Sequence, residues 1–159
     1  MILICYDGSP DSQAAIAQAG ELLHGESATV LTVWEPFIDM MCRVGAGMAY
    51  WDGVELAEID TESERAARAR AEEGVEIARA ASLHAQARTR ARGVTIAETI
   101  LSEADDVSAK TIVLGTRGLT GLKSLMLGSV SHAVLQHADR PVIVVPSPEI
   151  AAKRAANRH

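Results

Sequence analysis

The stretch GTRGLTGLKSLMLGSVSHAVLQH has the residue types and the spacing that phosphate chemistry needs. Gly115 and Gly118 are separated by two residues, nine more residues follow, and Gly128 then stands directly before Ser129. Glycines let a ligand come close to bare backbone N–H groups, and the unpaired N–H groups at a helix start favour negative charge. The stretch therefore predicts a phosphate site, with hydroxyl donors from Ser129 and Ser131.

The charges of this stretch point the same way. The whole chain has 15 Lys and Arg against 21 Asp and Glu, which gives a formal net charge of −6. Between Val107 and Ala138, however, the only formally charged residues are Lys110, Arg117 and Lys123. A local excess of positive charge is what an anionic ligand requires. Lys123 fits a solvated loop charge as well as a phosphate contact.

Two common phosphate-binding motifs do not match. The P-loop needs Gly before its Lys-Ser pair, and here Leu122 precedes Lys123. The dinucleotide fingerprint G-x-G-x-x-G also fails, because the glycines stand at 115, 118 and 121. The alternative without a ligand is that the glycines only form turns and that Ser129 is a helix N-cap.

Apolar periodicity predicts strands that alternate with helices. Ser9 is expected to cap a first helix, and the Thr-x-x-Glu spacings at Thr61 and Thr95 predict two further helix starts. The alternating Arg and Ala of the third strand make it an unusually polar one. The expected strands are MILICY, ATVLTVW, AQARTRAR, TIVLG and VIVV, and the first and last helices are expected from Pro10 to His24 and from Ser129 to His137.

Strands that alternate with helices imply a mostly parallel sheet covered on both faces, because parallel neighbours need crossover connections. Ligands of such sheets bind outside the carboxyl ends of the strands. In this chain those ends carry YDGS, VWEP, LGTRG and VVPS. At 159 residues we expect one domain over residues 1–147, followed by a basic, flexible tail over residues 148–159.

Composition excludes several classes of protein. The net charge of −6 and the pI near 5.3 give no general reason to bind nucleic acid or an anionic membrane. No stretch reaches the roughly 18 to 20 apolar residues of a membrane span, and the first residues do not read as a signal peptide. Cys5 and Cys42 show neither metal-ligand spacing nor a disulfide scaffold. We expect a cytoplasmic protein.

The pattern G-x2-G-x9-G-S, the DGS after the first strand and the last strand RPVIVVP together resemble the universal stress protein family, in the variant associated with ATP binding. The resemblance runs from ILICYDGSPDSQAA to Pro146. It implies an α/β, Rossmann-like single domain with an open parallel five-stranded sheet in the order 3-2-1-4-5 and helices on both faces.

The resemblance also implies ATP as the ligand, with Mg²⁺ held by phosphates and waters, and a homodimer through the last strand, Pro141 to Pro146. A further protein partner is left unidentified. Asp7 could instead stabilise the turn with Gly8, and Val33 could belong to the core. The ATP-binding residues carried over by position are Asp7, Val33, Gly115, Thr116, Arg117, Gly118, Gly128, Ser129, Val130 and Ser131.

Three functions fit these residues. The first is a regulatory module that binds ATP and hydrolyses it slowly at most, since no carboxylate pair orients His132 or His137. The second is an ATP-pyrophosphatase type of enzyme that adenylylates a substrate, although YDGSPDS lacks the paired glycines that this class needs. The third is a stress protein that binds no nucleotide and acts through protein contacts.

The segment from Glu35 to Asp60 is long and contains most of the aromatic residues and several methionines. It is interpreted as a lid or a surface for a partner, because Met supplies adaptable contacts. The alternative is that Val54 to Ile59 extends the following helix and packs on the core.

Overall fold

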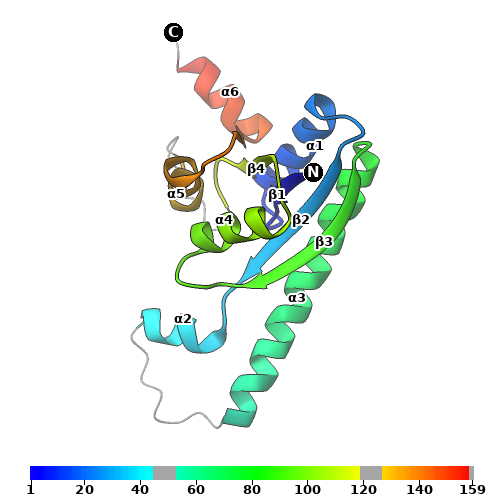
Figure 1. Cartoon of the computed structure of the whole chain (residues 1–159). Helices are drawn as coiled ribbons and strands as arrows, with labels where there is room; N and C mark the ends of the chain where they lie inside the picture. The colour runs from blue at the N-terminus through cyan, green and yellow to red at the C-terminus, as the bar shows by residue number, and fades with distance from the viewer. Residues whose placement is uncertain (45–52, 119–126, 158–159) are drawn as a thin grey trace.

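The computed structural model describes residues 1–44, 53–118 and 127–157 (Figure 1). Its centre is a sheet of five parallel strands in the order β3-β2-β1-β4-β5. The predicted fold class and strand order are therefore confirmed. The strands are β1 (Ile2–Cys5), β2 (Ser27–Trp34), β3 (His84–Ala91), β4 (Thr111–Gly115) and β5 (Val142–Val145).

Helices cover both faces of the sheet, so that two apolar layers form. One layer packs α1 and α3 against the sheet, and the other packs α4 and α5. Within β1, Ile2 and Ile4 belong to the first layer and Leu3 to the second, because successive strand residues point to opposite faces. Among the described residues, no helix is long and apolar enough to cross a membrane. The helices are α1 (Pro10–Leu22), α2 (Phe37–Val44), α3 (Gly53–Ala80), α4 (Ile96–Asp106), α5 (Ser129–His137) and α6 (Pro148–Ala156).

Two of the expected helix caps are confirmed. The Ser9 hydroxyl accepts a hydrogen bond from the Ser12 N–H (3.2 Å) at the start of α1, and the Thr95 hydroxyl accepts one from the Glu98 N–H (3.1 Å) at the start of α4. Each cap satisfies one of the N–H groups that a helix start leaves unpaired. These caps fix where the chain turns after β1 and after β3.

The predicted helix start at Thr61 is wrong. α3 begins at Gly53, and the Thr61 hydroxyl donates to the carbonyl of Ala57 one turn earlier (2.7 Å). Val54 to Ile59 therefore extends the helix, which confirms the first part of the alternative interpretation; packing of these residues on the core stays a prediction. α2 occupies the preceding part of the segment, and the Phe37 N–H donates to the Asp60 carboxylate (2.6 Å), which ties α2 to α3. Residues 45–52 of this segment lie outside the described residues.

The basic third strand exists, and its arginines face acids. Arg88 and Arg90 both form ion pairs with Glu103 of α4, whose side chain is 0% exposed. Arg92, the residue after β3, pairs with Glu35 in the same way. Two guanidinium groups compensate for the free-energy cost of burying the Glu103 carboxylate, because a buried charge is tolerated only when it is paired. The arginines in β3 and directly after it are thus explained by acidic partners on α4 and in the residue after β2.

Most of the stretch that we expected to be a C-terminal tail, Pro148–Ala156, forms the helix α6. Ser147 stands at the N-cap, and Pro148 occupies the first turn, where a missing N–H costs nothing. Ile150 is only 4% exposed, so the helix is held to the rest of the molecule by an apolar contact. An ion pair between Lys153 and Glu149 joins successive turns.

Candidate nucleotide site

The order of the sheet reverses between β1 and β4, and the predicted site residues gather there. β1 and β4 are parallel neighbours, so their carboxyl ends lie side by side. The turn with Asp7 follows β1, and the residues from Gly115 to Gly118 end β4 and follow it. In open α/β sheets this switch point is where ligands bind. The topology therefore brings together two sequence motifs that are far apart in the chain.

Asp7 and Gly118 are in direct contact at this point. A Cβ atom added to Gly118 would lie 2.5 Å from Oδ2 of Asp7, which is closer than real Cβ contacts occur. The other carboxylate oxygen, Oδ1, accepts a hydrogen bond from the Ser9 N–H (3.0 Å). The positive φ angles of described glycines are at Gly8 and Gly25, so Gly118 is required for space rather than for a left-handed turn.

Gly115 has a packing role in addition to the ligand contact that was predicted for it, which stays a prediction. It is buried, and a Cβ atom there would lie 2.6 Å from the carbonyl carbon of Asp11 and 2.8 Å from the backbone nitrogen of Ser12. Both atoms belong to the first turn of α1, which cannot yield as a flexible side chain would. The first glycine of the motif therefore allows α1 to pack against the end of β4.

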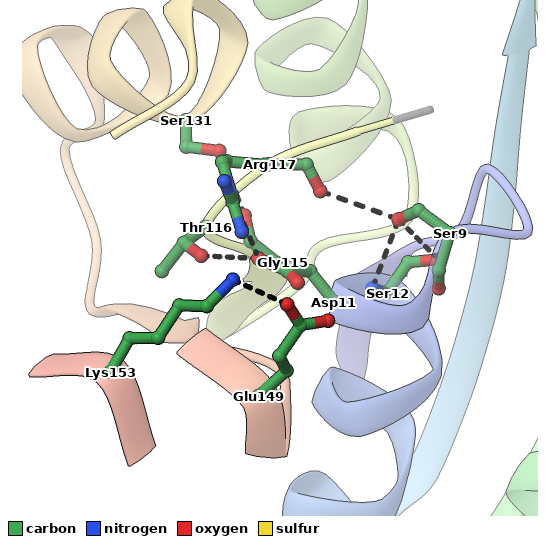
Figure 2. Close-up of polar contacts among 9 residues, drawn as sticks. All are labelled: Ser9, Asp11, Ser12, Gly115, Thr116, Arg117, Ser131, Glu149 and Lys153. Carbon is green, nitrogen blue, oxygen red and sulfur yellow. Dashed lines mark hydrogen bonds and ion pairs between the residues drawn. The ribbon is translucent and has the colours of Figure 1, made fainter. Parts of the chain in front are cut away.

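Thr116 and Arg117 are held by an acid that the sequence interpretation missed. The Thr116 hydroxyl donates to the carboxylate of Asp11, whose side chain is 6% exposed (Figure 2). The Arg117 Nε lies 3.8 Å from Oδ2 of the same carboxylate. Part of the positive charge expected for a phosphate is thus offset by Asp11. The sequence did contain a signal for this contact, since Asp11 stands in the first turn of a capped helix that follows β1.

The β1–α1 turn and the β4 loop are joined by hydroxyl groups. The Ser9 hydroxyl lies 3.3 Å from the Arg117 carbonyl, to which it donates, and the Ser12 hydroxyl donates to the Ser9 carbonyl (2.9 Å). Both serines are buried. Figure 2 shows this group between α1 and the strand end. The two loops that carry the candidate site are therefore fixed to each other.

The start of α5 forms the third part of the site. Gly128 is the N-cap, and its N–H donates to the Thr116 carbonyl (2.8 Å). Ser129 is exposed, whereas the Ser131 hydroxyl is buried and donates to the Gly115 carbonyl (2.8 Å). Of the two predicted hydroxyl donors, only Ser129 faces solvent. Lys123, for which a solvated loop charge and a phosphate contact were both left open, lies outside the described residues.

Val33 at the end of β2 and Val130 in the first turn of α5 lie on the face of the sheet that α4 and α5 cover. Both are half-buried and pack against the apolar layer beneath these helices. Cys5 ends β1 in the same layer, where burial, with a smaller contribution from the Asp7 charge, raises the pKa of its thiol to about 12. Because only the thiolate is reactive, Cys5 acts as a small apolar residue.

α6 brings two charged residues close to Arg117 (Figure 2). The Lys153 amine donates to the Glu149 carboxylate (2.5 Å) and lowers the pKa of that carboxyl group, and Arg117 lowers it further. Nothing in the motif pointed to these residues, since they follow it in a tail that we took to be flexible. The polar edge of the site therefore includes the C-terminal helix.

Two other features, a hollow at the far edge of the sheet and the possible metal ligands, do not add to the candidate site. A hollow of about 860 Å³ lies at the opposite, amino edge of the sheet, beside Met1, His24 and His84. It is remote from the glycines and from the strand ends where such sheets bind ligands. Within residues 1–44, 53–118 and 127–157, no three or more His, Cys, Asp and Glu side chains form a group that could hold a metal ion.

Comparisons with known proteins agree with this architecture. The chain is 34% identical over 146 residues to a universal stress protein of Thermus aquaticus, covering 91% of this chain and 96% of that protein. It is 32% identical over 146 residues to the universal stress protein YxiE of Bacillus subtilis, covering 91% and 97%.

Solved structures share the fold. The structure of protein MJ0577 superposes with a TM-score of 0.74 at 22% identity, over 91% of this chain and 94% of that one. A universal stress protein solved with cAMP superposes with a TM-score of 0.61 at 20% identity, over 92% of this chain and 95% of that one. One from Archaeoglobus fulgidus solved with dAMP gives 0.58 at 22% identity, over 91% and 95%.

The family model of the universal stress proteins covers the sheet, the helices on both of its faces and every predicted site residue. Its match runs over residues 1–146, so α6 lies beyond it. Together with the identities above 30% over nearly the whole length of two relatives, this match establishes that the chain belongs to the universal stress protein family.

Proposed function

We propose that this protein binds an adenine nucleotide at the switch point between β1 and β4 and works as a regulatory module. The observation that carries the proposal is the contact between Asp7 and Gly118, which joins the turn after β1 to the glycines after β4. ATP is the proposed ligand, with Mg²⁺ held mainly by phosphates and waters. The cAMP and dAMP bound in two proteins of the same fold support an adenine nucleotide.

In this proposal each part of the site recognises a different part of the ligand. Asp7 hydrogen-bonds the adenosine, and Val33 lines the adenine slot. Ser129 and the free N–H groups of the first turn of α5 receive the phosphates. Hydrolysis is slow at most, because His132 and His137 lie exposed on α5 and the described residues give neither of them an orienting carboxylate.

The proposal is tested on the purified protein. Nucleotide released on denaturation should be identified by chromatography as an adenine nucleotide. Added Mg-ATP at about 100 times its dissociation constant should stabilise the fold by roughly 2.7 kcal/mol, a rise in Tm of about 5 to 10 °C. A protein that carries no nucleotide and shows no shift would contradict the proposal.

A second candidate is a stress protein that binds no nucleotide and acts through protein contacts. Two predicted phosphate contacts are already engaged within the protein, Arg117 with Asp11 and Ser131 with the Gly115 carbonyl. The adenylylating enzyme has less support, because the turn after β1 lacks the paired glycines. That enzyme would release pyrophosphate rapidly and only with its substrate, which a phosphate assay would detect.

We also propose a homodimer through β5. Among the residues that the structure describes, β5 pairs only with β4, and its residues Val142, Ile143 and Val144 are half-buried. An unpaired edge of such residues is a template for a partner strand.

We expect Val144→Lys to shift the protein from dimer to monomer, because a charge would have to be buried in the interface. Light scattering after size exclusion measures the mass. Val94→Lys is the control, since Val94 is 77% exposed and lies away from β5. A folded Val144→Lys variant that keeps the dimer mass, or a monomeric wild type, would contradict this interface.

A further inference from the structure

The side of α3 that faces the sheet holds one cation. The other residues on this side are small or apolar and buried: Ala67, Ala71, Gly74, Val75 and Ala78. Arg70 is half-buried and stands three residues after Ala67 and four before Gly74, which places it on the same side of the helix. A guanidinium on this side is unexpected, because its neighbours form the contact with the strands.

The position of Arg70 is fixed by close packing of the next helical turn. A Cβ atom at Gly74 would lie 2.8 Å from Cδ1 of Tyr6 and 2.8 Å from Cγ1 of Val30, so α3 approaches β1 and β2 closely there. The Tyr6 hydroxyl donates to the Glu73 carboxylate (2.8 Å). These contacts set the register of α3 against the carboxyl end of β1.

From this position Arg70 reaches the candidate site. A Cβ atom at Gly8 would lie 3.5 Å from Nε and 3.6 Å from Cδ of Arg70. Gly8 has a φ of +84° and stands between Asp7, which contacts Gly118, and Ser9, which caps α1. The guanidinium group therefore borders the turn after β1 on the side of α3, opposite Val33 and Val130.

Arg70 has no partner among the described residues. Nine other arginines of that part of the chain pair with carboxylates. Arg70 forms no ion pair and donates no hydrogen bond to residues 1–44, 53–118 or 127–157. On α3 itself the residues four away are Ala66 and Gly74, and Glu73 already binds Tyr6.

A half-buried cation without a counter-charge is unfavourable, and a planar guanidinium is well suited to bind phosphate. We infer that Arg70 is an anion-binding residue of the candidate site and that it contacts a phosphate group of the ligand. This inference rests on the proposed function. It supplies the unpaired positive charge that Arg117, held by Asp11, does not. The site thereby favours phosphorylated nucleotides over the nucleoside.

The test compares three ligands by calorimetry: ATP, adenosine and inorganic tripolyphosphate. Arg70→Gln should weaken the binding of ATP about 10- to 100-fold, because a charge-assisted hydrogen bond is lost. It should leave the binding of adenosine unchanged. Arg70→Lys should recover part of the ATP affinity. Arg68→Gln is the matched control, because Arg68 lies on the same helix, is 76% exposed and pairs with Glu72. Far-UV spectra and melting confirm that each variant is folded.

Each outcome is decisive. Unchanged ATP affinity in Arg70→Gln, or equal losses for ATP and adenosine, overturns the role of Arg70 while the proposed function stands. If the wild type binds tripolyphosphate but no nucleotide, and Arg70→Gln loses that binding, the proposed function fails and the anion contact holds. If the wild type binds none of the three ligands, both are overturned.

Discussion

Gly118→Val should abolish the stabilisation that Mg-ATP gives to the wild type. The new Cβ would meet Oδ2 of Asp7 at 2.5 Å, so that the carboxylate must leave the position from which it faces the site. Gly118 itself is exposed, and the carboxylate is the movable end of a side chain, so the fold should tolerate the change. We expect the Tm shift of about 5 to 10 °C in the wild type to fall to near zero in the variant.

Gly93→Val is the control for adding a branched side chain, because among the described residues beyond its chain neighbours a Cβ at Gly93 has only Thr99 Oγ1 near it, at 3.5 Å. It should keep the full shift. Both variants should keep the far-UV spectrum of the wild type and melt cooperatively. A Gly118→Val protein that is stabilised as strongly as the wild type would show that Gly118 is a turn residue and that phosphate binds elsewhere.

Sequence patterns predicted the sheet well, because they report local geometry. The strand TIVLG and the capped starts at Ser9 and Thr95 were found where residue types, spacing and side-chain caps agree. The error at Thr61 has the same origin. A Thr three residues before a Glu also fits inside a helix, where the hydroxyl bonds back to the carbonyl of Ala57. The spacing alone does not distinguish the two cases.

The motif glycines illustrate what a pattern leaves open. Gly115 and Gly118 were assigned the same role, and both are glycines for lack of space. What occupies the space differs: backbone of α1 at Gly115 and a site carboxylate at Gly118. Only the packing of α1 on β4 distinguishes a glycine that makes room for helix backbone from one that makes room for a carboxylate of the candidate site.

The charged side chains that helices bring to strands and strand ends could not be predicted from the sequence, for a similar reason. Asp11, Glu103 and Arg70 each lie on helices whose own neighbours do not reveal which strand end or partner they face. The charge of Arg117 was counted as free for a phosphate because Asp11 is distant in the chain. The topology places Asp11 beside Arg117, and for this reason the anion contact that we propose is Arg70.

Gly115→Ala should lower stability without any ligand. The methyl group would lie 2.6 Å from the carbonyl carbon and 2.8 Å from the Cβ of Asp11, and relief requires α1 to move away from β4. Overpacking of this kind costs about 1–3 kcal/mol or somewhat more, so Tm should fall by about 5 to 10 °C in thermal denaturation followed by circular dichroism.

The matched control is Gly93→Ala, whose methyl group would lie 3.5 Å from Thr99 Oγ1, the nearest atom in the described part of the chain outside its neighbours, and should change Tm by little. If α1 moves, the Thr116 bond to Asp11 and the Arg117 ion pair lengthen together, since both end on the same carboxylate. Gly115→Ala should therefore free part of the Arg117 charge even as it destabilises the fold. A variant as stable as the wild type would mean that α1 and β4 are less closely packed than these distances require.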